Sequence, residues 1–284
     1  MVIFEIATNI SEILSAATHF DESKMVEHFI KIESQIGPDE ARALFRICMQ
    51  LPEHTKILEI GSYKGGSAVA MGHACIEKNL QLYCLDMWSS YNRQREYFNR
   101  DIPVSHDRQV LLEFLDNTDF IGSRLCMLRG ATTQFFDVFS GNSDGVFSLV
   151  FIDGAHDYYS VAEDIILGLK VIKAGGFLCG HDYHSSGLDV VRAVDDVIMK
   201  SETIVRKGLI NYTSIWYAVI DDPEYELLIA KVVRYMARGD FATAYNKLMN
   251  EIETVKHTGE IDRLVKGLEV ELGIRGEMNN RRPI

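Results

Sequence analysis

Ionisable side chains follow two apolar segments of this sequence. The stretch VFIDGAHDYYS, residues 150–160, begins as an apolar run and then delivers Asp153 and, three residues later, His156. A second apolar run ends on His181 and Asp182. Carboxylate oxygens are the ligands that Mg²⁺ prefers, and a histidine of near-neutral pKa suits a general base. These residue types predict a divalent metal between Asp153 and Asp182, with His156 as the base beside it.

A second constellation lies earlier, in LEIGSYKGGS, residues 58–67. Gly61 and Gly65 permit close approach by a ligand, and the free N–H groups at the start of the following helix favour an anion. The G-x-x-x-G spacing differs from the dinucleotide pattern, which weakens the case for nicotinamide. Asp86 ends the next apolar run, where a carboxylate suits a ribose diol. Together with Glu59, these residues predict a nucleoside-type cofactor.

Alternating strand and helix patterns must position these residues. Five short apolar runs read as strands, each followed by a helical or loop segment, and a final pair reads as antiparallel strands: 56–60, 81–86, 124–130, 147–153, 177–183, 202–210 and 213–220. Such alternation predicts a doubly wound, mostly parallel seven-stranded α/β sheet. The nearly continuous apolar runs indicate strands covered by helices on both faces.

The predicted sheet brings distant residues together. Ligands of doubly wound sheets bind outside the carboxyl ends of the strands. Gly61, Asp86, Gly130, Asp153 and Asp182 all fall at predicted strand ends, so we expect them to converge on one crevice.

The chain divides into three parts by pattern. Residues 1–50 read as N-terminal helices, 51–222 as the sheet domain, and 223–284 as a C-terminal helical extension. The apolar stripe of the extension is too large to leave in water, so we expect it to cover the sheet or to form a homo-oligomer. Its members are Leu227, Val232, Met236, Phe241, Ala244 and Leu248.

Composition excludes several classes. A net charge of −12 argues against a nucleic-acid partner, because phosphate binding needs clustered Lys and Arg. No uncharged apolar run approaches the roughly 20 residues that span a bilayer, so we expect no membrane association. The N-terminus shows no secretory signal pattern. Five scattered cysteines without a CxxC pair indicate reduced thiols and a cytoplasmic protein.

The motifs described above resemble those of class I S-adenosylmethionine-dependent methyltransferases. The similarity is greatest to the catechol O-methyltransferase-like enzymes and to the methyltransferase-24 type, which is related to macrocin-type sugar O-methyltransferases. It is carried by ILEIGSYKGGSAV, LDMW, RGATTQF, FIDGAHDYYSVAEDI and AGGFLCGHDY, and upstream by IESQIGPDEARALF. It covers roughly residues 25–220 and implies a Rossmann-like methyltransferase fold with S-adenosylmethionine as cofactor.

The resemblance also implies roles for individual residues. The methionine end of the cofactor would lie at Glu59, Gly61, Ser62, Tyr63, Gly65 and Ser67. The ribose would lie at Asp86, and the adenine at Met87, Ala131 and Thr132. Asp153 would lie near the reactive methyl group and bind the metal, with His156 as the base.

One position departs from the family pattern. These families usually have a carboxylate where this chain has His181, and imidazole suits Zn²⁺, Fe²⁺ or Mn²⁺ better than Mg²⁺. Three interpretations stay open. His181 is a ligand of a softer metal together with Asp153 and Asp182, or it is a second base or substrate contact, or no metal is tightly bound.

The leading hypothesis is metal-assisted O-methylation of a small-molecule hydroxyl, on a sugar or another polyhydroxylated metabolite. The alternatives are an N- or S-methyltransferase without a metal, and a non-catalytic nucleotide-binding or scaffold protein. His156 beside Asp153 favours an enzyme, because a binder needs no base next to an acid. The residues that choose the acceptor are expected within 88–106 and in the N-terminal helices, which carry no readable chemistry. Trp88, Tyr91 and Tyr97 either line an acceptor pocket or pack a lid.

Overall fold

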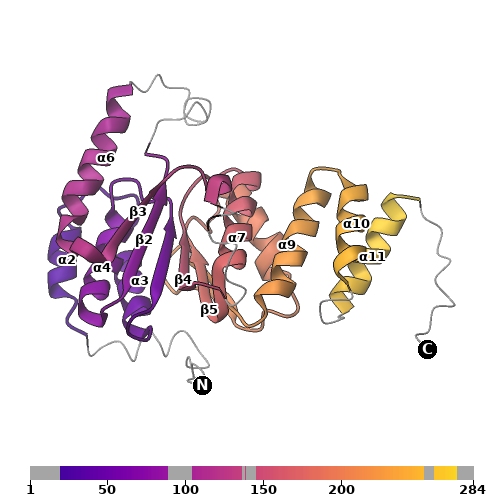
Figure 1. The fold of residues 1–284 in the computed structure, drawn as a ribbon, viewed down its shortest axis with the longest axis horizontal. Coiled ribbons are helices and arrows are strands. Elements are labelled where there is room, and N and C mark those ends of the chain that lie inside the picture. Colours follow the sequence, from indigo (N-terminus) through magenta and orange to yellow (C-terminus); the bar gives the residue numbers. More distant parts are fainter. Residues whose placement is uncertain (1–19, 89–103, 136–137, 139–144, 253–258, 274–284) are drawn as a thin grey trace.

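The fold is known from a computed structural model of the chain (Figure 1). It describes residues 20–88, 104–135, 138, 145–252 and 259–273. Tyr91 and Tyr97, like most of the stretch expected to choose the acceptor, lie outside the described residues. Within the described part, no helix is both long and apolar enough to cross a membrane.

A seven-stranded sheet forms the centre of the molecule, with the strand order β3-β2-β1-β4-β5-β7-β6. The neighbouring pairs among β1 to β5 are parallel, whereas β7 runs antiparallel to both β5 and β6. The strands are β1 Lys56–Ile60, β2 Gln81–Asp86, β3 Leu125–Arg129, β4 Phe147–Ile152, β5 Ile172–Gly180, β6 Lys207–Leu209 and β7 Trp216–Ile220. The predicted doubly wound, mostly parallel sheet is therefore confirmed.

Helices cover both faces of the sheet, which explains the continuous apolar strands. All six side chains of β4 are buried. Because side chains alternate along a strand, Leu149 and Phe151 enter one core, and Val150 and Ile152 the other. The first core is completed by α2 Ser23–Phe29, α3 Pro38–Gln50, α4 Gly66–Lys78, α6 Val104–Thr118 and η2 Asp119–Arg124. The second core takes in α7 Tyr158–Val171, α8 Leu188–Val194, η4 Asp195–Met199 and part of α9 Pro223–Ala237.

One expected helix lies only partly within the described residues. Residues 132–139 read as a helix, and Thr132–Phe135 of this stretch form the 3-10 helix η3. Residues 136–137 and 139–144 lie outside the described part.

The C-terminal helices build a third core of their own. α9 is followed by α10 Phe241–Glu251 and α11 Gly259–Glu271, and these helices extend from one side of the sheet domain (Figure 1). Val232, Ala244 and Leu248 of the predicted stripe are buried within this core, and Met236 and Phe241 pack against it. The chain itself therefore covers the stripe, and the expected homo-oligomer stays a prediction.

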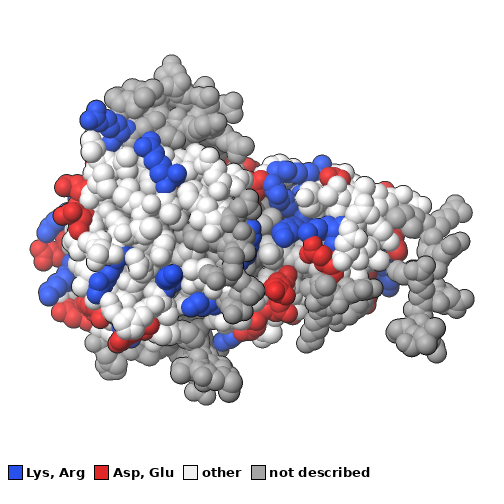
Figure 2. All heavy atoms as spheres, in the orientation of Figure 1, with Lys and Arg blue, Asp and Glu red and all other residues white. Residues whose placement is uncertain are grey.

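α9 joins this unit to the sheet domain. Ala230 is buried in the second core, while Arg234 and Arg238 both contact Glu163 of α7. Basic and acidic side chains lie next to one another near this junction in Figure 2. Removing α9 would therefore expose α7.

Candidate active site

Strand register brings the candidate residues to one edge of the sheet. Ile60 of β1 pairs with Ile152 of β4, which pairs in turn with Gly180 of β5. The residues that follow these three partners are Gly61, Asp153 and His181. Two backbone hydrogen bonds hold them in line, from Asp153 N–H to Ile60 O (2.7 Å) and from His181 N–H to Ile152 O (2.9 Å).

Gly61 belongs to the predicted cofactor loop, residues 61–67, and is the residue at which this loop contacts the end of β4. Its φ of +88° belongs to the left-handed region, which favours glycine. A Cβ atom built there would lie 2.1 Å from the carbonyl oxygen of Asp153. Gly65 (φ +90°) then forms the N-cap of α4. The two glycines therefore allow the loop to turn tightly against Asp153 and to start a helix beside it.

Glu59, in β1, holds the cofactor loop in place through side-chain hydrogen bonds. It is fully buried. One carboxylate oxygen accepts hydrogen bonds from Ser62 Oγ (2.5 Å) and Cys84 Sγ (3.1 Å), and the other accepts one from Ser67 Oγ. Burial raises the pKa of Glu59 to about 7, although these hydrogen bonds oppose the shift. Three predicted cofactor residues, Glu59, Ser62 and Ser67, are thus tied into one buried network.

Asp86 also holds the loop. Its Oδ2 accepts the backbone N–H groups of Ser62 (2.8 Å) and Tyr63 (2.9 Å), and its Oδ1 accepts that of Trp88 (2.6 Å). A carboxylate offers about four lone-pair sites, so Oδ1 retains capacity for a ribose hydroxyl. Met87 follows it, half-buried. Trp88 is buried and donates from Nε1 to Tyr63 O (3.0 Å), so it packs the loop instead of lining an open acceptor pocket.

The predicted adenine-side turn lies next to Asp86. Gly130 N–H donates to Asp86 O (3.0 Å), and Ala131 N–H donates to Gln134 Oε1 (2.9 Å). Ala131 and Thr132 are half-buried. Thr132 also hydrogen-bonds the buried carboxyl group of Asp164, whose pKa burial raises to about 7.

The residues just before α3 pack against the cofactor loop on the side away from Asp86. Lys64, almost fully buried, pairs with Glu33 (2.7 Å) before α3 and with Glu113 (2.8 Å) in α6. A small pocket opens between this segment and the loop. Its lining residues are Ser34, Gln35, Ile36, Gly61, Ser62, Tyr63, Gly66, Ser67 and Asp153.

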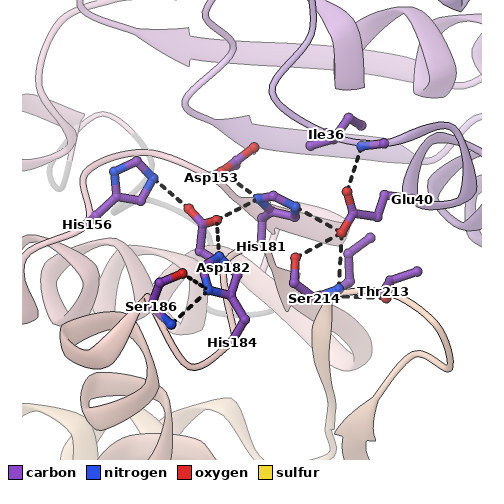
Figure 3. Close-up of polar contacts among 12 residues, drawn as sticks. Ile36, Glu40, Asp153, His156, His181, Asp182, His184, Ser186, Thr213 and Ser214 are labelled. Carbon is purple, nitrogen blue, oxygen red and sulfur yellow. Dashed lines mark hydrogen bonds and ion pairs between the residues drawn. The ribbon is translucent and has the colours of Figure 1, made fainter.

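On the other side of Asp153, three imidazoles contact the carboxylate of Asp182 (Figure 3). Its Oδ2 lies 2.6 Å from His156 Nε2, and its Oδ1 lies 3.1 Å from His184 Nε2 and 3.2 Å from His181 Nδ1. Asp182 has a φ of +61°, a strained conformation for a residue other than glycine. Such strain clusters at functional sites, and here it turns the carboxylate toward the histidines.

His181 lies between carboxylates. Its Nδ1 faces Asp182 and also Asp153 Oδ1 (3.5 Å), and its Nε2 lies 3.0 Å from Glu40 Oε1. This last contact is an ion-pair distance whose alignment falls short of a hydrogen bond. Burial would lower the pKa of His181, but the contacts with Asp153, Asp182 and Glu40 raise it to about 12.

Asp182 and His156 shift each other's pKa. Burial would raise the pKa of Asp182, but His156 and His181 hold it well below its usual range. Contact with Asp182 raises the pKa of His156, against the effect of burial. His156 itself is exposed, with 43% of its side chain accessible, so it can reach a bound molecule.

The donor set fits a divalent metal. Asp153, His181 and Asp182 each offer one ligand atom, and these atoms lie within 4.8 Å of one another. Two carboxylates and one imidazole suit Mn²⁺, Fe²⁺ or Zn²⁺ better than Mg²⁺. His181 would have to bind through Nδ1 without its proton there.

Comparison with known proteins identifies the domain that carries this site. Residues 58–183 match the model of the Methyltransf_24 family, described as a methyltransferase domain. These residues are similar to that methyltransferase family. The match confirms the resemblance to the methyltransferase-24 type of class I S-adenosylmethionine-dependent methyltransferases, and the prediction that the protein is a methyltransferase. A search of curated proteins finds no match.

Solved structures of similar fold are distant in sequence. The O-methyltransferase TomG from Streptomyces achromogenes shares 14% identity and a TM-score of 0.46, over 74% of this chain and 90% of that one. An O-methyltransferase from Bacillus cereus shares 12% and 0.47, over 74% and 97%. The O-methyltransferase NovP shares 17% and 0.46, over 66% and 82%.

Several residues of this candidate site could not be predicted from the sequence. Glu40 lies in a helix that carried no readable chemistry, and Ser214 lies in the turn before β7. His184 read as a loop residue, but it contacts Asp182 (3.1 Å), and its Nδ1 accepts from the Ser186 N–H (3.3 Å). Asp164 read as part of an amphipathic helix. An acidic residue in a predicted helix is an ordinary surface feature, so sequence offered no signal for Glu40 or Asp164.

Proposed function

We propose that this protein is an S-adenosylmethionine-dependent O-methyltransferase that methylates a hydroxyl of a small molecule with the help of a divalent metal. The observation that carries the proposal is the direct contact of two different sites at Asp153. Gly61 of the cofactor loop packs against the backbone of Asp153, and the carboxylate of Asp153 faces His181 (3.5 Å). The methyl donor would therefore lie on one side of Asp153, and the histidines and carboxylates that remove the acceptor proton would lie on its other side.

The donor side would hold the cofactor through the loop. Bound S-adenosylmethionine supplies an electrophilic methyl group on its sulfonium, so the protein has mainly to align it. The turn from Gly61 to Gly65 and Ser67 would bind the methionine end, and the lone pairs of Asp86 a ribose hydroxyl. Met87, Ala131 and Thr132 would border the adenine. These assignments follow from the family resemblance and from the half-buried positions of the residues.

The acceptor side would remove the hydroxyl proton. His156 is exposed, and its Nε2 lies 2.6 Å from Asp182 Oδ2, which leaves Nδ1 to face an acceptor hydroxyl. In its neutral form, His156 would take the proton from the acceptor hydroxyl onto a ring nitrogen, and Asp182 would stabilise the imidazolium that forms. Asp153, His181 and Asp182 would hold the metal, and a bound divalent ion lowers the pKa of a coordinated hydroxyl.

The substrate class follows from this arrangement. A hydroxyl needs deprotonation before it attacks the methyl group, whereas a neutral amine nitrogen has a free lone pair. A base paired with carboxylates therefore favours a hydroxyl over a neutral amine as the nucleophile. A sugar or another polyhydroxylated small molecule would offer such hydroxyls.

Two measurements test the proposal. Calorimetry should show binding of S-adenosylmethionine and no comparable binding of NAD. With a panel of sugar and phenolic hydroxyl acceptors, methyl transfer should stop with a chelator and return with Mn²⁺, Fe²⁺, Zn²⁺ or Mg²⁺. The Asp182→Ala variant should lose this rescue and keep cofactor affinity.

The outcomes separate the alternatives. Full activity in the presence of the chelator would overturn the metal and leave His156 as the base. Transfer to amines or thiols alone would favour an N- or S-methyltransferase. Cofactor binding without transfer to any acceptor would favour a binding or scaffold protein.

A further inference from the structure

Glu40 lies on the first turn of α3, outside the residues that match the family model. Its side chain is only 14% exposed. It reaches across to β5 and meets the His181 imidazole (Figure 3), although it is 141 residues away in the chain (181 − 40). A carboxylate that leaves a helix surface to reach a catalytic edge calls for an explanation beyond helix capping.

The carboxylate of Glu40 accepts three hydrogen bonds from two residues, Gly37 and Ser214. Oε2 accepts the backbone N–H of Gly37 (2.7 Å), which completes the cap of α3. Oε1 accepts both the backbone N–H (3.0 Å) and the Oγ–H (2.8 Å) of Ser214, in the turn before β7. These donors belong to separate elements, so the carboxylate cannot rotate without breaking hydrogen bonds at both of them.

This fixed oxygen forms an ion-pair contact with one nitrogen of the His181 ring. Glu40 Oε1 lies 3.0 Å from Nε2 of His181. The two imidazole nitrogens lie on opposite sides of the ring, so contact at Nε2 leaves Nδ1 directed at Asp153 (3.5 Å) and Asp182 (3.2 Å). A histidine that binds a metal through one nitrogen usually donates its other N–H to a carboxylate, which sets the tautomer and the ring orientation.

We propose that Glu40 is a positioning residue that holds the His181 ring with Nδ1 toward Asp153 and Asp182, so that this nitrogen is available as a metal ligand. Glu40 does not touch the reacting atoms; it acts through His181. The part of the inference that concerns the metal rests on the proposed function, whereas the orientation of the ring does not.

The test compares Glu40→Ala with Asp39→Ala in the full chain. Asp39 is a matched control, because it removes a carboxylate from the same helical turn. Its own partner is Arg42 (2.8 Å), and its side chain is 74% exposed. Mn²⁺ and S-adenosylmethionine affinities are measured by calorimetry. The His181 Nε2 proton is followed in metal-free protein by imidazole NMR, assigned with a His181→Gln spectrum.

We expect Glu40→Ala to bind Mn²⁺ about 10–100-fold more weakly than wild type, the usual loss for the partner of a metal-bound histidine. Its affinity for S-adenosylmethionine should change by less than about twofold. The slowly exchanging Nε2 proton should be present in wild type and in Asp39→Ala, and absent in Glu40→Ala. If Glu40→Ala is unstable, Glu40→Gln replaces it, because glutamine keeps the size but loses the charge that holds the Nε2 proton.

The two proposals fail in different ways. If wild type does not bind Mn²⁺, the metal of the proposed function is wrong and the NMR comparison alone decides the role of Glu40. If the variant retains both the Mn²⁺ affinity and the Nε2 proton of wild type, Glu40 only caps α3 and the inference is overturned.

Discussion

The two sides of the crevice are built on different physical principles. On the donor side, Gly61 and Gly65 shape the backbone, and the buried carboxylate of Glu59 is surrounded by hydroxyl and thiol donors. On the acceptor side, Asp153 and Asp182 face histidines across ion-pair distances of 2.6 to 3.5 Å. The donor side therefore depends on shape, and the acceptor side on coupled charges.

This difference teaches how each side should respond to mutation. A binding site shaped by the backbone loses ligand affinity when an added side chain keeps two backbone segments from approaching each other closely. A site made of coupled charges loses function when one charge is removed, because its partners are left uncompensated. The loss then appears in the rate and in its pH dependence. The next four predictions are ordered by their expected effect on the reaction.

The largest effect is expected from His156→Ala. Removal of a general base costs about 10²–10⁴ in turnover, and cofactor affinity should stay close to wild type because His156 is absent from the donor side. Steady-state kinetics on an identified acceptor measures the first, and calorimetry the second. His54→Ala is the control, because His54 is hydrogen-bonded to Asn79 near the N-terminal ends of β1 and β2, away from the site. A wild-type rate for His156→Ala would remove this residue from the mechanism.

The pH profile sharpens the same prediction. Asp182 raises the pKa of His156 above its ordinary value of 6.5, so the base is protonated and inactive up to a higher pH than a free histidine. The rate of wild type should therefore rise with pH through a midpoint above 6.5. A midpoint below 6.5 would contradict the coupling of His156 to Asp182.

A large effect on affinity is expected from Gly61→Ala. Its Cβ would lie 2.1 Å from the Asp153 carbonyl oxygen, so the loop has to move away from β4. S-adenosylmethionine affinity should fall by about 100-fold, which corresponds to about 2.8 kcal/mol. Gly175→Ala is the matched control, since Gly175 has a similar φ of +76° and no atom within 4 Å of its added Cβ. Equal affinities in the two variants would show that the close approach is unimportant.

A smaller loss is expected from Asp86→Ala. The change removes the acceptor of the Ser62 and Tyr63 N–H groups and the proposed ribose contact. Hydrogen bonds to a charged group contribute about 1.5–3 kcal/mol each, so affinity for S-adenosylmethionine should fall at least about tenfold. Titration calorimetry measures this directly. Binding as tight as in wild type would exclude Asp86 as a ribose ligand.

The smallest effect on the reaction is expected from Glu59→Gln, which should instead change stability. Burial raises the pKa of Glu59 from 4.5 to about 7, so the folded state favours its protonated form. Wild type should lose stability as pH rises from about 4.5 to about 7, by up to about 3 kcal/mol. The glutamine variant lacks this titration. Urea unfolding at pH 5 and pH 8 should show the variant gaining relative to wild type at the higher pH; a constant difference would refute the prediction.

Much of the donor side could be predicted from the sequence, because its signals are local. The loop from Gly61 to Ser67 follows an apolar strand and starts a helix, and backbone turns of this kind are encoded within a few residues. The strands themselves showed as continuous apolar runs because helices cover both faces of the sheet. The same patterns predicted that Asp86 and Asp153 lie at the carboxyl ends of strands in one parallel sheet, which the register of β1, β2 and β4 shows.

Tertiary structure alone decided the partners of the acceptor side. The pairing of Glu40 with His181 and Ser214 joins three elements that are far apart in the chain. Periodicity and spacing report which face of an element is buried, but they carry no information about which charged side chains meet across elements. The apolar stripe of the C-terminal helices shows the same limit. Its spacing indicated that it must be buried, and only the packing of α9, α10 and α11 showed that the chain buries it within itself.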